Sequence, residues 1–204
     1  MRIGLDFDNT IACYDHVFRA AARAAGWLPQ EFDGTKTDVR NLLRSMPDGE
    51  LNWQRLQGQV YGALMHETTM ADGVSEFLRN ARRSGAALFV VSHKTEYGHF
   101  DPARVNLHDA ARQWLMDQGF FADDVYGMRL QNVYFETDRM SKVARIAALD
   151  LDVFIDDLPE VFAEPDFPAR TRRILFANGS IGGDGPYERC ADWAEIDYVV
   201  FGNR

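Results

Sequence analysis

The chain has 204 residues, of which 46% are hydrophobic and 12% aromatic, and its formal net charge is −9. A chain of this length and composition can bury the core of one domain, or of one domain that carries a smaller insertion. The negative charge argues against a general nucleic-acid binder, because binding to a phosphate backbone requires a basic surface.

Neither the apolar runs nor the cysteines indicate a membrane protein or a secreted one. The longest apolar runs, such as AALFVV, are far shorter than the roughly 20 residues that cross a bilayer. The first residues lack the basic and then apolar layout of a signal peptide. Cys13 and Cys190 lie far apart without CxxC spacing, which favours free thiols over a disulfide framework or a zinc site. We therefore expect a cytoplasmic protein.

Short β-rich runs alternate with helical patterns along most of the chain. This alternation predicts an α/β fold with a Rossmann-like parallel sheet that helices cover on both faces. The helical patterns lie at residues 72–85, 102–118 and 141–149. The strands are expected at residues 3–7, 87–91, 133–135, 153–155 and 174–176.

Two regions depart from this alternation. Residues 13–69 contain only broken helical segments, so we expect a helical cap insertion there and a core domain made of residues 1–12 and 70–204. The tail NGSIGGDGPYERCADWAEIDYVV is rich in turn residues, and we expect it to wrap the surface of the core.

Charged and hydroxyl side chains follow three of the predicted strands. In open parallel sheets the ligand site forms outside the carboxyl ends of the strands, so these side chains should meet at a common rim. Lys142 should join them from the start of the helix at residues 141–149. The side chains that follow the strands are Asp6 and Asp8, then Ser92, His93 and Lys94, and finally Asp156 and Asp157.

Four carboxylates at one rim need a cation. Two carboxylates about 4 Å apart repel by roughly 4 kcal/mol at an effective dielectric of about 20. Hard oxygen ligands with no nearby set of histidine and cysteine ligands favour Mg²⁺, which binds through one or two carboxylates together with a substrate phosphate. The sequence therefore predicts a site for Mg²⁺ and phosphate.

The motifs at these positions resemble the haloacid dehalogenase superfamily. LDFDNT is similar to its first motif, an apolar strand followed by DxDx[TV]. LFVVS is similar to the second, Lys142 is the best match to the lysine of the third, and VFIDD is similar to the fourth, with paired acids. The motifs occur in the family's order and the resemblance covers most of the chain, which implies the family's fold with a small helical cap.

The resemblance also implies roles. Asp6 would attack phosphorus to form an aspartyl-phosphate, and Asp8 would act as general acid and then as general base. Ser92 and Lys142 would hold the phosphoryl oxygens. An acid at Asp8 is similar to the phosphatase and phosphotransferase branches, which argues against dehalogenase activity.

The resemblance also implies which residues bind the metal and which support the loop and the substrate phosphate. Mg²⁺ would be bound by Asp6, by the backbone carbonyl of Asp8, and by either Asp156 or Asp157 directly with the other acting through water. Thr10 would support the loop that carries Asp8, and His93 and Lys94 are candidates for contact with the substrate phosphate. Lys94 and Arg139 remain alternatives to Lys142 as the motif lysine. The histidines at positions 93, 99 and 108 match no standard set of metal ligands.

The expected activity is Mg²⁺-dependent hydrolysis of a small soluble phosphomonoester, such as a sugar phosphate or a nucleotide. A cap of this kind restricts its enzymes to small substrates, and the expected partner is therefore a phosphorylated metabolite. Two alternatives stay open: a phosphotransferase or mutase of the same fold, and a non-catalytic module that binds a phosphate ligand. The sequence does not define the oligomeric state.

Overall fold

The computed structural model describes residues 1–101, 103–178 and 185–202. The chain divides into two compact units. The first comprises Met1–Ala12, Met70–Lys94 and Met116–Arg204, and the second comprises Cys13–Thr69 and Thr95–Leu115.

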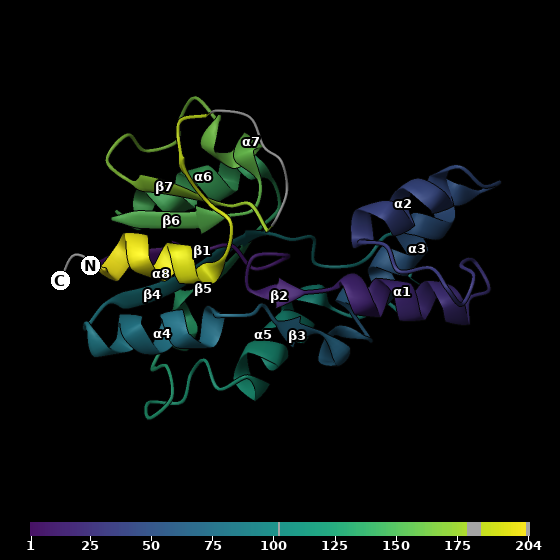
Figure 1. The fold of residues 1–204 in the computed structure, drawn as a ribbon, viewed down its shortest axis with the longest axis horizontal. Coiled ribbons are helices and arrows are strands. Elements are labelled where there is room, and N and C mark those ends of the chain that lie inside the picture. Colours follow the sequence, from purple (N-terminus) through teal and green to yellow (C-terminus); the bar gives the residue numbers. More distant parts are fainter. Residues whose placement is uncertain (102, 179–184, 203–204) are drawn as a thin grey trace. The chain divides into compact units, whose positions relative to one another are not determined.

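Six parallel strands form the main sheet of the first unit, in the order β5-β4-β1-β6-β7-β8 (Figure 1). The central strand β1 pairs with β4 on one side and β6 on the other, so the ends of these three strands lie side by side. The expected α/β class and parallel sheet are confirmed. The strands are β1 (Arg2–Leu5), β4 (Ala87–His93), β5 (Val133–Glu136), β6 (Val153–Asp156), β7 (Arg172–Phe176) and β8 (Glu188–Cys190).

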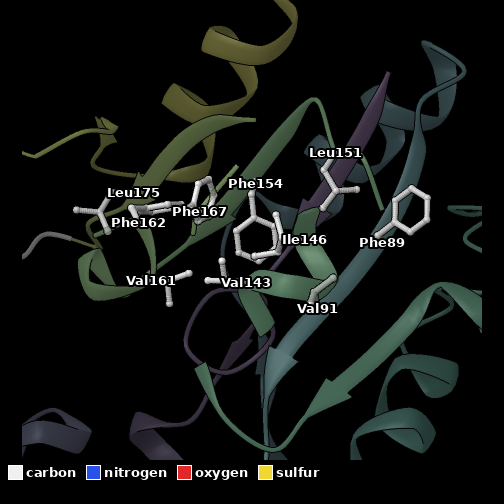
Figure 2. Packing of buried hydrophobic residues seen from close by; sticks show 10 residues of the cluster. All are labelled: Phe89, Val91, Val143, Ile146, Leu151, Phe154, Val161, Phe162, Phe167 and Leu175. Atoms are coloured by element: carbon white, nitrogen blue, oxygen red, sulfur yellow. The ribbon is translucent and has the colours of Figure 1, made fainter. Parts of the chain in front are cut away.

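Helices cover both faces of this sheet, because alternate side chains of each strand point to opposite sides. On one face, α6 (Arg139–Ala148) and α7 (Pro159–Phe162) cover an apolar cluster built around Phe154 (Figure 2). On the other face, Trp193 of α8 (Trp193–Phe201) packs on Phe77 of α4 (Val74–Arg83), with ring centroids 5.0 Å apart. The cluster in Figure 2 consists of Phe89, Val91, Val143, Ile146, Leu151, Phe154, Val161, Phe162, Phe167 and Leu175.

The end of the chain is more regular than its turn-rich sequence predicts. β8 extends the sheet beside β7, and α8 packs on α4, so the expectation of a tail that only wraps the surface is wrong for residues 188–201. The helix begins where Asp192 Oδ1 accepts a hydrogen bond from Glu195 N at 2.8 Å and Glu195 Oε2 accepts one from Ala191 N at 2.7 Å. Residues 179–184 of the predicted tail lie outside the described residues.

The second unit is mainly helical. It contains α1 (Asp15–Ala24), α2 (Lys36–Arg44), α3 (Gly49–Tyr61), the short 3₁₀ turn η1 (Met65–Glu67) and most of α5 (Leu107–Asp117). Phe18 of α1 stacks on Trp53 of α3 with ring centroids 5.1 Å apart, and the ring of Tyr61 meets Phe18 edge-on. Aromatic packing of this kind buries a large apolar area in a small unit.

Residues 95–115 belong to this second unit, whereas the sequence placed them in the core domain. The reason is a close approach of two backbones: a Cβ on Gly98 would lie 2.5 Å from Cα of Gly58 in α3, so only glycine permits the contact. Trp114 Nε1 also donates a hydrogen bond to the carbonyl of Thr68 at 3.1 Å.

The helix expected at residues 102–118 begins later than predicted, at Leu107. Asn106 Oδ1 accepts hydrogen bonds from the backbone N–H groups of His108 and Asp109, at 3.0 and 3.1 Å, and so caps the first turn. Residue 102 itself lies outside the described residues.

Two short strands occur where none was expected. β2 (Ala12–Cys13) and β3 (Thr69–Met70) pair with each other and lie where the chain passes between the units. A second 3₁₀ turn, η2 (Leu130–Asn132), precedes β5. None of the helices in the described part of the chain combines the length and the apolar character that a membrane span requires.

Candidate active site

Asp6 lies at the carboxyl end of the central strand. Its backbone N–H donates to the carbonyl of Ile155 at 2.8 Å, which keeps the backbone beside β6 for one residue after β1 ends. Its Oδ1 accepts hydrogen bonds from Ser92 Oγ at 2.9 Å and from Lys142 Nζ at 2.6 Å. The residue is 5% exposed, so one carboxylate oxygen is tightly bound in a nearly buried position.

A tight loop follows β1 and brings the side chains of Asp8 and Thr10 to the site. Asn9 adopts a left-handed conformation with φ of 62°, which asparagine tolerates better than most residues, and its N–H donates to the carbonyl of Ala12 at 2.9 Å. Thr10 is fully buried, and its Oγ1 donates to Asp157 Oδ1 at 3.2 Å. The loop that bears Asp8 is thereby tied to the loop after β6.

The paired acids after β6 complete a compact carboxylate group. Asp6, Asp156 and Asp157 each offer an oxygen within 4.8 Å of the others. Asp156 is fully buried; its Oδ2 accepts from Lys142 Nζ at 2.6 Å and its Oδ1 from Leu158 N at 2.9 Å. Lys142, in the first turns of α6, therefore bridges the acids at the ends of β1 and β6.

This crowding changes the protonation equilibria of the buried groups. Burial raises the pKa of Asp156 to about 6; Lys142 opposes this shift and the Asp6 carboxylate adds to it. Burial alone would lower the pKa of Lys142, but Asp156 and Asp6 outweigh that effect and raise the pKa above the ordinary lysine value. Lys142 therefore stays charged between the two acids.

The donor set fits a hard divalent cation. All the ligand atoms of the three-acid group are carboxylate oxygens, which Mg²⁺ prefers to nitrogen or sulfur. Four carboxylates face two ammonium groups, those of Lys142 and Lys94, so the pairs described leave two negative charges in excess. A divalent cation would balance that excess.

Asp8 makes a different contact from the other acids. Both of its oxygens lie close to Lys94 Nζ, at 2.9 and 2.8 Å, and the side chain of Lys94 is 3% exposed. Lys94 was expected to contact the substrate phosphate, but in the structure its ammonium group lies against Asp8.

The structure brings most of the predicted site residues together. Ser92 and Lys142 meet at Asp6, and Thr10 meets Asp157. Of the alternatives to Lys142, Arg139 pairs with Glu164 at 3.2 Å.

The histidines take no part in these contacts. His93 ends β4 as an exposed residue, and no hydrogen bond between it and the carboxylates of the site is found among the described residues. Its contact with the substrate phosphate stays a prediction. The histidines at positions 93, 99 and 108 form no group of potential metal ligands within the described ranges.

Two supporting contacts were not predicted. The indole Nε1 of Trp193 donates to the carbonyl of Thr10 at 3.2 Å, so the last helix of the described chain fixes the loop that bears Asp8. The backbone N–H of Leu158 fixes Asp156. The sequence does contain a signal for the helix that carries Trp193, because Asp192 and Glu195 have the spacing of a helix start. The contact of Leu158 with Asp156 depends on the local backbone turn alone.

Solved structures share the fold of this chain over nearly its whole length. A haloacid dehalogenase-like hydrolase from Streptococcus pneumoniae matches with a TM-score of 0.59 and 11% identity, covering 97% of both chains. A HAD-family hydrolase from Deinococcus radiodurans with bound phosphate and sodium matches with a TM-score of 0.57 and 15% identity, covering 98% of this chain and 94% of its own. The chain has the haloacid dehalogenase fold.

A third structure with this fold is CbbY from Rhodobacter sphaeroides in complex with xylulose-1,5-bisphosphate. It has a TM-score of 0.52 and 17% identity, with 96% of this chain and 95% of that chain covered. No protein-family model matches the sequence, and no curated protein matches it. At such low identities the haloacid dehalogenase fold is the level at which these structures describe the chain.

Proposed function

We propose that the protein is a Mg²⁺-dependent phosphomonoester hydrolase that works through an aspartyl-phosphate on Asp6. The observation that carries this proposal is the surroundings of Asp6: a hydroxyl and an ammonium group hold one of its oxygens, and two further acids lie within 4.8 Å. Proteins of the same fold bind phosphate and a sugar bisphosphate, which supports a small phosphorylated substrate.

The first chemical step uses Asp6 and Asp8. A carboxylate oxygen of Asp6 attacks phosphorus in line, the bond from phosphorus to the ester oxygen breaks, and Asp8 donates a proton to that leaving oxygen. Ser92 and Lys142 stabilise the charge on the transferring phosphoryl oxygens.

The second step releases phosphate. Asp8, now ionised, takes a proton from water while the water oxygen bonds to phosphorus. The bond from phosphorus to Asp6 then breaks, which restores the Asp6 carboxylate and returns Asp8 to its protonated form. Both steps require that Asp6 and Asp8 lie on the same loop and that each is oriented toward the atom with which it reacts.

Asp6, Asp157 and the backbone carbonyl of Asp8 would hold the metal. When bound, Mg²⁺ would supply positive charge that offsets the charge on the phosphoryl group. Both oxygens of Asp156 already accept hydrogen bonds, from Lys142 and from Leu158, which favours Asp157 as the direct ligand and Asp156 as a ligand through water.

The helical insertion supports a small, soluble substrate. It consists of residues 13–69, and we propose that residues 95–115 act with it as one cap domain, since the two segments form one compact unit. We therefore infer that the substrate is a sugar phosphate, a nucleotide or a metabolite of similar size.

The decisive experiment measures phosphate release from a panel of sugar phosphates, nucleoside monophosphates and small acid phosphates, with Mg²⁺ and with EDTA. Asp6→Asn should abolish turnover and keep the fold. The matched control is Asp152→Asn: Asp152 binds the backbone N–H of Arg2, at the opposite end of β1, and this variant should remain active. Substantial turnover by Asp6→Asn would exclude Asp6 as the nucleophile, and full activity in EDTA would exclude the metal.

A further inference from the structure

We propose that Lys94 is a positioning residue that sets the direction of the Asp8 carboxylate. The proposal rests on the proposed function for the role of Asp8. Lys94 Nζ lies 2.9 Å from Oδ1 and 2.8 Å from Oδ2 of Asp8. Contact with both oxygens defines the orientation of the carboxylate as well as its distance, so the pair selects one side-chain rotamer of Asp8.

Lys94 is itself firmly placed. It directly follows β4, and its backbone N–H donates to the carbonyl of Glu136 at 2.9 Å. Its Nζ lies 5.4 Å from the ring centroid of Phe7, and Phe7 packs edge-on against Phe135 at 6.1 Å. A buried ammonium group needs a counter-charge, which the ionised form of Asp8 supplies. The protonated form that acts as general acid still accepts a hydrogen bond from Lys94, so neither side chain can turn away without cost.

The two buried lysines of the site thus have different tasks. Lys142 contacts Asp6 and Asp156, the proposed nucleophile and one of the paired acids. Lys94 contacts Asp8, the proposed acid and base. Substitution of Lys94 should therefore affect proton transfer to the leaving group more than it affects phosphate binding.

The test compares two substrates whose leaving groups differ in their need for a proton. Glycerol phosphate releases an alkoxide that must be protonated, whereas p-nitrophenyl phosphate releases a stable phenolate. For Lys94→Met, kcat/KM should fall by about 100-fold on the first ester and by less than about 10-fold on the second. The inhibition constant of inorganic phosphate should change by less than about 3-fold.

Two variants accompany Lys94→Met. Lys94→Arg should restore most of the lost activity, because a guanidinium group also contacts both oxygens of a carboxylate. Arg172→Met removes an ion pair with Glu188 at the start of β7, at the other end of the strands, and should leave both esters unaffected.

Several outcomes would overturn the proposal. An equal loss on both esters would mean a structural role, and a raised phosphate inhibition constant would mean that Lys94 binds substrate. A crystal structure of Lys94→Met gives a readout without activity: the Asp8 carboxylate should be rotated, and an unchanged Asp8 contradicts the positioning role. If the wild type hydrolyses neither these two esters nor any member of the phosphate-ester panel, while the Asp8 carboxylate is rotated in Lys94→Met, the proposed function fails and the positioning role stands.

Discussion

Thr10 and Asp157 are 147 residues apart in the sequence, yet Thr10 Oγ1 donates a hydrogen bond to Asp157 Oδ1 at 3.2 Å. This bond joins the loop that carries the proposed acid and base to the proposed metal ligand. Thr10 is fully buried and Asp157 is half-buried, so the contact is partly shielded from competing water.

Replacement of Thr10 should weaken the metal site. Residues that orient a metal ligand typically contribute about 10- to 100-fold in affinity, so Thr10→Val should raise the Mg²⁺ concentration for half-maximal activity by about 10-fold. Thr10→Ser keeps the hydroxyl and is the control. The Mg²⁺ affinity is measured by titrating the activity with Mg²⁺ and by isothermal titration calorimetry. Equal affinities of Thr10→Val and wild type would contradict the prediction.

Lys142→Met should destabilise the metal-free protein. Removing one partner of a buried ion pair costs about 3–5 kcal/mol, because the remaining charge is left uncompensated, and here both Asp6 and Asp156 lose their shared ammonium group. Urea unfolding in EDTA measures the loss. Mg²⁺ should restore part of the lost free energy of unfolding, since the ion binds the folded state.

The control for Lys142→Met is Arg79→Met, which removes an exposed charge from α4. That variant should unfold like the wild type, because exposed ion pairs contribute little. Equal stability of Lys142→Met and wild type in EDTA would mean that the two acids do not depend on the lysine.

Cys190 should resist thiol reagents. Burial raises the pKa of its thiol to about 11, and the carboxylates of Glu195 and Glu188 add to the shift. At pH 8 iodoacetamide should therefore modify the partly exposed Cys13 before Cys190, and mass spectrometry of the labelled peptides reports the order. Faster labelling of Cys190 would contradict the burial.

The same shift predicts a dependence of stability on pH. The folded thiol has a higher pKa than the unfolded thiol, whose pKa is about 8.5. Its contribution to the free energy of unfolding is therefore fully present below about pH 8.5 and is lost as the pH rises through about 11. Urea unfolding measures the free energy of unfolding of the wild type and of Cys190→Ala. The difference between the two values should become smaller as the pH rises from about 8.5 to about 11.

The rim of the sheet was predictable because its residues follow local rules. Short β-rich runs marked the strands, and parallel strands bring their carboxyl ends to one edge, so Asp6, Ser92 and Asp156 had to lie close together. The order of the motifs added Lys142 from the helix after β5. No distant contact had to be known for these conclusions.

Other features depended on contacts that the local sequence does not contain. The close approach of Gly58 and Gly98 assigns residues 95–115 to the helical unit, and neither glycine predicts its partner. Likewise, the pairing of Lys94 with Asp8 depends on the left-handed turn at Asn9, which sets the direction of the loop. The last helix was missed although Asp192 and Glu195 have the spacing of a helix start.

During synthesis, β1 leaves the ribosome long before its neighbours do. Its Ile3 pairs in register with Leu88 of β4 and with Val153 of β6. At about 5–20 residues per second, the roughly 150 residues between the first and last of these partners take on the order of 10–30 s to make. Ile3 and Leu5 are both fully buried in the native sheet, and during this time they lack the neighbouring strands that bury them. The apolar centre of the sheet therefore cannot close before β6 emerges, and the nascent chain is most vulnerable to aggregation until then.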